Sequence, residues 1–117
     1  MPNPVAVSVS LNITADPAVT LSPHEIPVEH GETEITWTGS SSSPNTGFDF
    51  SSLSFGSSTP SCFSNLSVSS SEITIDDDNL CKGKYSYTLD VNYDGKTYSS
   101  VKTGPGGDMT SPTIHNK

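Results

Sequence analysis

The chain has 117 residues and a net charge of −8, with thirteen acidic residues against five basic ones. This length allows one domain with one hydrophobic core, and the negative charge argues against nucleic acid and membrane surfaces as partners, because it repels phosphate backbones and anionic lipid. The sequence shows neither a signal peptide nor the run of about 18 apolar residues that a membrane span requires, so we expect a cytoplasmic protein, with secretion left open.

The first third of the sequence predicts extended structure. Apolar and polar residues alternate over residues 5–13, as in a strand with one buried face. Prolines restrict the next stretch to short extended pieces at a sheet edge, because proline donates no hydrogen bond to a ladder. These pieces are residues 18–21 and 26–28. Residues 33–39 alternate again and place Ile35 and Trp37 together on an inward face.

The middle of the chain predicts a loop followed by short strands. Residues 40–47 are rich in serine and contain proline and glycine, which indicates a loop. The apolar residues that follow change parity between Phe50 and Leu53, which predicts a bend or bulge. Residues 66–68 and 73–75 alternate over lengths typical of short strands.

The longest alternating segment is residues 84–93, which predicts a strand with a polar outward face. Its inward face carries Tyr87, Leu89 and Val91. We expect these side chains to pack against Trp37 between two sheets, because a sandwich closes its core by contacts of this kind.

Asp94 and Gly95 follow this segment and predict a hairpin turn. A two-residue loop places Tyr98 opposite Val91 and inward. A three-residue loop that ends in a left-handed glycine places Tyr98 opposite Asp90 and outward. We prefer the three-residue loop, because it also places Val101 inside, and we expect Tyr98 to be at least partly exposed.

Residues 1–103 carry seven to eight short strands, with turn signals about every 8–12 residues and no helical period. This pattern predicts an all-β domain built as an antiparallel β-sandwich. Residues 104–117 begin with glycines and a proline, which predicts a linker followed by a short C-terminal extension.

A short segment adds a family resemblance. Residues 81–87 (CKGKYSY) resemble the approach to strand F of immunoglobulin-like domains, where Asp-x-Gly-x-Tyr-x-Cys is usual, and Gly83 and Tyr85 match. The resemblance implies an immunoglobulin-like sandwich in which the Tyr85 hydroxyl bonds backbone a few residues upstream. Tyr87 takes the position of the second core cysteine and Cys81 that of the aspartate, so no antibody-like disulfide is implied.

Two further segments resemble small bacterial immunoglobulin-like proteins of the DP-EP type. Asp16 and Pro17 precede the first proline-rich edge, and residues 111–116 are similar to the closing motif of that family, with Ser111 in place of aspartate. The second dipeptide is interrupted by Ile26. The resemblance implies no particular activity.

The two cysteines, Cys62 and Cys81, leave two states open. In the cytosol two free thiols are the ordinary expectation, whereas an oxidising compartment favours a disulfide. Neither cysteine has a C-x-x-C partner, so they do not predict a metal site.

An acidic run, Asp76, Asp77 and Asp78 followed by Asn79, predicts a turn and offers the oxygen ligands that calcium prefers, with Asp90 or Asp94 as further ligands if folding brings them near. The spacing differs from that of an EF-hand loop. Consecutive residues of a strand point to opposite faces, so the three aspartates can bind one ion together only if they lie in a turn. Two interpretations stay open, a solvated acidic turn and a calcium site.

Aromatic residues near the hairpin suggest a second ligand. Tyr93 and Tyr98, with Asn92 and Asp94 as polar partners, are suited to bind the rings of a carbohydrate if the tyrosines are exposed. The alternative is that both tyrosines belong to the core, as most aromatic residues in strands do.

The sequence contains no G-x-S-x-G elbow, no H-E-x-x-H pattern and no phosphate-binding loop, so we expect no enzymatic activity. We predict a non-catalytic protein-interaction or assembly module that binds a protein partner or self-associates through edge strands. The alternative is a ligand-binding module for calcium or carbohydrate. Apart from calcium, we expect no cofactor.

Overall fold

A computed structural model describes residues 3–15, 18–22, 24–29, 31–40, 43–55, 60–100 and 112–116, and all regular structure in these ranges is β-strand. The prediction of an all-β protein is therefore confirmed. None of these ranges contains a helix long and apolar enough to cross a bilayer. The strands are β1 Asn3–Leu11, β2 Val19–Ser22, β3 Glu25–Val28, β4 Thr33–Gly39, β5 Asp49–Ser54, β6 Phe63–Val68, β7 Glu72–Asp77, β8 Gly83–Ser86, β9 Thr88–Tyr93, β10 Lys96–Ser99 and β11 Thr113–Asn116.

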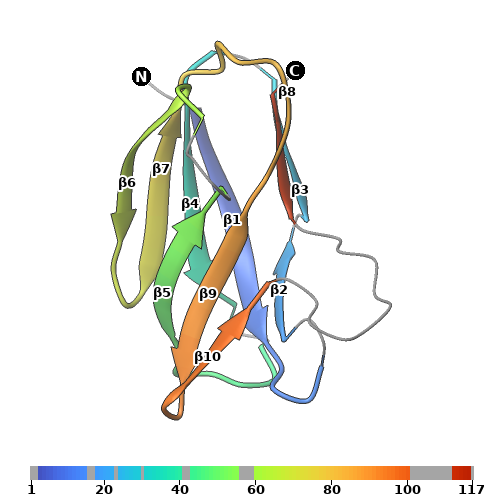
Figure 1. Cartoon of the computed structure of the whole chain (residues 1–117), viewed down its shortest axis with the longest axis vertical. Helices are drawn as coiled ribbons and strands as arrows, with labels where there is room; N and C mark the ends of the chain where they lie inside the picture. The colour runs from blue at the N-terminus through green and yellow to red at the C-terminus, as the bar shows by residue number, and fades with distance from the viewer. Residues whose placement is uncertain are drawn as a thin grey trace.

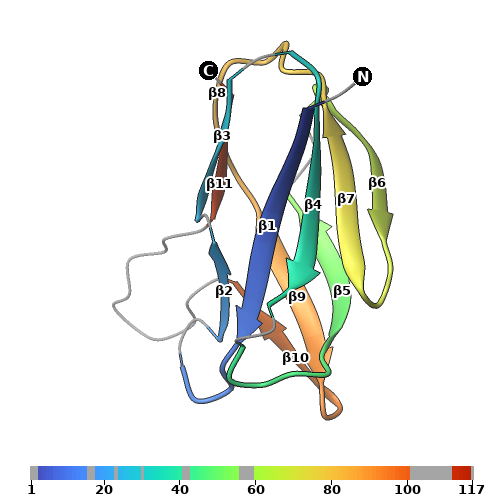
Figure 2. The ribbon, with the colours of Figure 1, turned by 180° about the vertical axis from the view of Figure 1, so that it is seen from behind.

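The strands form one five-stranded sheet and two three-stranded sheets. The five-stranded sheet has the order β2-β1-β4-β7-β6, and the other two have the orders β10-β9-β5 and β3-β11-β8. Because β8 ends at Ser86 and β9 begins at Thr88, one stretch of chain runs from one three-stranded sheet into the other. In Figures 1 and 2 the β10-β9-β5 sheet lies across one face of the five-stranded sheet.

The prediction of purely antiparallel sheets is wrong, because two strand pairs are parallel. β1 runs parallel to β4, with Val7 opposite Trp37, and β3 runs parallel to β11, with Ile26 opposite Ile114. Each of these pairs joins strands that are not neighbours in the sequence. Apolar alternation reports which face of a strand is buried, and it carries no information on the direction of the neighbouring strand.

The described residues also contain more strands than the predicted seven to eight. The predicted strand over residues 84–93 is divided at Tyr87, because β8 pairs with β11 and β9 pairs with β5 and β10. The predicted first strand begins and ends two residues earlier than expected. Its last predicted residue, Ile13, lies in an exposed turn.

Two predictions about irregular positions are confirmed. The proline-rich stretch supplies β2 and β3, and each is an edge strand of its sheet. The parity change in β5 is a bulge, because the pairing of β5 with β9 shifts register between Phe50 and Ser52. The bulge lets both Phe50 and Leu53 face the core.

The preferred register of the last hairpin is wrong. Tyr93 pairs with Lys96 and Tyr98 pairs with Val91, so the loop has two residues. Both of them, Asp94 at φ 51° and Gly95 at φ 77°, adopt the left-handed backbone of a type I′ turn. Tyr98 is therefore on the same face as Val91 and is half-buried against the core.

The core confirms the predicted contact between sheets. Trp37 of the five-stranded sheet and Tyr87, between β8 and β9, pack edge to face with ring centroids 5.4 Å apart. The Trp37 indole Nε1 donates a hydrogen bond to the Tyr87 hydroxyl at 3.1 Å. Ile35, Leu89 and Val91 are buried in the same cluster, as predicted.

The predicted C-terminal extension contributes β11, which is the middle strand of the β3-β11-β8 sheet. Ile114 pairs with Ile26 on one side and with Tyr85 on the other, and Ile114 is fully buried. Residues 104–111, which the prediction assigns to the linker and the first residue of the extension, lie outside the described residues, as does Val101 with its predicted inward position.

Candidate functional site

A polar candidate site lies where β7 ends, at the end of the molecule that carries both chain termini (Figure 1). A cavity of about 210 Å³ is lined there by residues of β4, β6 and β7 and by residues that flank these strands. Every lining side chain carries an oxygen atom, and four of them are carboxylates. We call this cavity the acidic end pocket; its lining residues are Glu32, Thr33, Ser64, Asn65, Asp76, Asp77 and Asp78.

Asp77 is the buried carboxylate of this pocket. As the last residue of β7, it lies opposite Thr33 of β4, and only 1% of its surface is exposed. Its Oδ1 accepts hydrogen bonds from the Asn79 backbone N–H at 2.9 Å and from the Asn116 Nδ2 at 3.1 Å. In the part of the chain that the structure describes, its Oδ2 has no hydrogen-bond partner. Burial raises the pKa of Asp77, because desolvation disfavours the charged carboxylate.

The two flanking aspartates are more accessible. The Asp76 Oδ2 accepts a hydrogen bond of 2.8 Å from the Asn65 Nδ2 on β6. The Asp78 Oδ1 accepts the Leu80 backbone N–H at 2.9 Å. The expectation of a solvated turn is wrong for Asp76 and Asp77, because β7 continues through Asp77. It is also wrong for Asn79, because this residue is buried.

Folding brings together only part of the predicted calcium ligands. Asp76, Asp77 and Asp78 line one pocket, whereas Asp90 pairs in the middle of the β10-β9-β5 sheet. The β9–β10 hairpin, which carries Asp94, lies at the opposite end of the molecule from the segment that joins β7 to β8 (Figure 1). The buried amide Asn79 belongs to the predicted run, whereas the buried amide Asn116, which donates to Asp77, is a residue that sequence reasoning missed.

Both cysteines lie beside this pocket, and both are free thiols. The Asn116 Nδ2 donates to the Cys81 carbonyl oxygen at 2.8 Å and lies 4.0 Å from the Cys62 Sγ. A ligand atom of Cys62, one of Asp77 and one of Asp78 all lie within 4.8 Å of one another. Burial first, and then the neighbouring Cys81, raise the pKa of the Cys62 thiol to about 12. Cys62 is therefore protonated at neutral pH.

The residues predicted to bind carbohydrate are on two different faces of the β9–β10 hairpin. Tyr93 and Tyr98 are on the side of Val91 and are half-buried against the core. Asn92 is exposed on the other side, where its Oδ1 accepts a hydrogen bond of 2.8 Å from the Thr97 hydroxyl. The structure therefore does not assemble these tyrosines and Asn92 on one surface.

An apolar edge is a second candidate surface, which sequence reasoning did not single out. β6 is the outer strand of the five-stranded sheet, and every residue after Phe63 in this strand is exposed. Leu66 and Val68 are 44% and 39% exposed. Alternation in residues 66–68 predicted the strand, but it gave no sign that the apolar side chains would face solvent.

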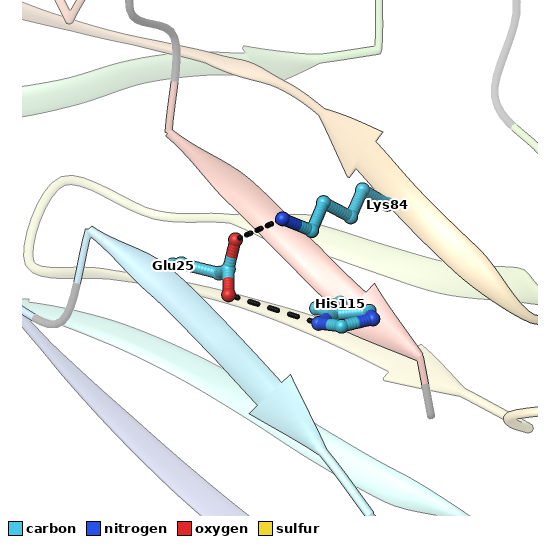
Figure 3. A network of polar contacts seen from close by, with 3 residues as sticks. All are labelled: Glu25, Lys84 and His115. Atoms are coloured by element: carbon cyan, nitrogen blue, oxygen red, sulfur yellow. Dashed lines mark ion pairs between the residues drawn. The ribbon is translucent and has the colours of Figure 1, made fainter.

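A charged cluster crosses the β3-β11-β8 sheet on its exposed face (Figure 3). The Glu25 carboxylate lies 3.2 Å from the Lys84 Nζ and 3.7 Å from the His115 Nδ1. The hydrogen bond from Lys84 is the main cause that lowers the pKa of Glu25. Exposed ion pairs contribute little to stability, so we assign this cluster to the pairing of the three strands.

Comparison with known proteins gave no match to a protein-family model and no match to a curated protein.

Proposed function

We propose that this chain is a non-catalytic interaction module with an immunoglobulin-like sandwich fold, and that it self-associates by pairing β6 with β6 of a second copy. The observation that carries the proposal is the edge strand β6, with Leu66 and Val68 exposed on it. An exposed edge presents unpaired backbone N–H and C=O groups, which a second strand satisfies.

The immunoglobulin-like fold is supported by the surroundings of Tyr85 and Tyr87. The Tyr85 hydroxyl lies 3.4 Å from the carbonyl oxygen of Lys82, which fits the upstream backbone contact of a corner tyrosine. Tyr87 is buried and hydrogen-bonded to Trp37 in the other sheet. We propose that this aromatic pair fills the position that an inter-sheet disulfide takes in antibody domains.

Charge favours a second copy at β6 over other parts of the surface. The sequence has no charged residue between Asp49 and Glu72, although the whole chain has a net charge of −8. This uncharged stretch supplies β6 and most of β5, so the pairing strand itself carries no charge, and the acidic residues beside it, Glu72 and Asp76, lie on β7. Edge strands are usually protected by lysine or proline, and β6 contains neither; it has one register shift, between Ser64 and Ser67.

Light scattering after size exclusion tests the proposal, with samples from about 10 μM to about 1 mM, a range that covers weak dimers. We expect the wild-type mass to rise toward that of a dimer, and to do so more readily at high salt, which screens the remaining repulsion. The variants Leu66→Lys and Val68→Lys should stay monomeric, since each places a charge on the edge.

Leu80→Lys is the matched control. Leu80 is 80% exposed and lies outside β6, so this variant should associate like the wild type. A wild-type protein that stays monomeric over the whole range contradicts the proposal, and so does equal loss of association in Leu66→Lys and Leu80→Lys.

The free thiols Cys62 and Cys81 support a cytoplasmic location, which we propose together with this function, because a reducing compartment keeps such thiols unpaired.

A further inference from the structure

We infer that the acidic end pocket binds a divalent cation, calcium, through the side chains of Asp77 and Asp78. This inference does not depend on self-association through β6, and its test is separate.

The first argument is the charge of the pocket. Among the described residues, its lining includes four carboxylates and no basic side chain. A ligand oxygen of Asp77 and one of Asp78 lie within 4.8 Å of each other, a separation that one cation bridges. Carboxylates held this close repel each other unless a cation or a proton lies between them.

The second argument comes from three buried oxygen atoms, one on Asp77 of the acidic cluster and two on asparagine amides. Asp77 Oδ2, Asn79 Oδ1 and Asn116 Oδ1 each lack a hydrogen-bond partner among the described residues, and the three residues are at most 3% exposed. All three atoms are acceptors, whereas buried polar atoms are normally paired. Asp77 itself lines the pocket, so at least one of these atoms belongs to a side chain that a bound cation would contact.

The orientation of the Asn116 amide is fixed by its surroundings. Its nitrogen donates to the Cys81 carbonyl oxygen at 2.8 Å and to the Asp77 Oδ1 at 3.1 Å. Reversal of the amide would place its oxygen against these two acceptors. The orientation of this oxygen is therefore a property of the fold, and it belongs to a side chain that is hydrogen-bonded to Asp77.

The donor set decides which cation fits. Among the described residues the lining of the pocket consists of oxygen-bearing side chains, and the one sulfur atom grouped with Asp77 and Asp78 is that of Cys62, which is not part of the lining. Zinc prefers thiolate and imidazole ligands, whereas carboxylate and carbonyl oxygens suit a hard cation such as calcium or magnesium. Magnesium demands near-ideal octahedral geometry, whereas calcium accepts irregular sets of six to eight oxygens, including water.

Calorimetric titration of the full chain tests this inference, with calcium chloride up to about 10 mM to cover weak sites. We expect one calcium ion per chain and a melting temperature that rises with calcium concentration, because a ligand of the native state stabilises it. Asp78→Asn keeps the oxygen that accepts the Leu80 N–H and removes the charge, so this variant should fold and bind calcium at least tenfold more weakly.

Asp94→Asn is the matched control, because it removes the same charge at the other end of the molecule, and it should bind like the wild type. Absence of both heat and thermal stabilisation in the wild type overturns the inference. Equal weakening of calcium binding in Asp78→Asn and Asp94→Asn also overturns the inference, because it shows a general effect of net charge and no specific site. A protein that responds to zinc or magnesium but not to calcium overturns it as well.

Discussion

Truncation of Trp37 to alanine is the perturbation whose cost can be worked out most fully. Trp37 is completely buried, and its ring packs edge to face on Tyr87 at 5.4 Å. Loss of a buried tryptophan side chain costs about 3–5 kcal/mol through lost burial and the cavity left behind. The change also leaves the Tyr87 hydroxyl without its donor in a buried position, so we expect a value in the upper part of that range.

A loss of this size is a large part of the total stability of a small domain, which is about 5–15 kcal/mol. Urea denaturation followed by far-ultraviolet circular dichroism measures it, because fluorescence of the only tryptophan is lost in the variant. If Trp37→Ala unfolds at the same urea concentration as the wild type, Trp37 does not join the two sheets and the core assignment is wrong.

A double-mutant cycle separates the hydrogen bond from the packing. Trp37→Phe and Tyr87→Phe each leave one buried polar group unpaired, at a cost of about 1–3 kcal/mol beyond the change in packing. The double variant removes both polar groups together. It should therefore lose less stability than the sum of the two single changes. Simple additivity would show that the 3.1 Å hydrogen bond contributes nothing.

Three smaller predictions follow from other parts of the chain. Lys84→Ala should change the free energy of unfolding by no more than about 0.5 kcal/mol. It should also raise the pKa of Glu25, because the ammonium group stabilises the charged carboxylate, and carboxyl chemical shifts in a pH titration measure this rise. A thiol reagent at neutral pH should label Cys81 first and Cys62 much more slowly, because Cys62 is buried with a raised pKa; equal rates would contradict the packing of Cys62. Gly95→Ala should cost about 1 kcal/mol in urea denaturation, because alanine disfavours the left-handed backbone at φ 77°.

Sequence alternation predicted the strands well and their neighbours poorly. The bounds of β4 and the inward faces of Trp37 and Tyr87 follow from local pattern alone, because a period of two is set by which face is buried. The parallel pairing of β1 with β4 depends on contacts between distant segments. No residue of β1 or β4 marks the direction of its neighbour.

The candidate site was predictable only in part, for the same reason. The acidic run 76–78 is visible in the sequence, but burial of Asp77 depends on its neighbours in the fold. Asn116 reaches Asp77 because β11 inserts between β3 and β8. In the sequence, Asn116 stands in a short extension beyond a glycine-rich stretch, where nothing connects it to β7.

Amide hydrogen exchange at low and high protein concentration tests the central claim, that β6 is the interaction edge. Pairing with a second copy gives the outward backbone N–H groups of residues 64–68 a partner, so their protection should rise with concentration. The other edge strand of the same sheet, β2, serves as the internal reference and should show no change. Protection that stays constant in β6, or that rises in β2 instead, would contradict the proposed interaction edge.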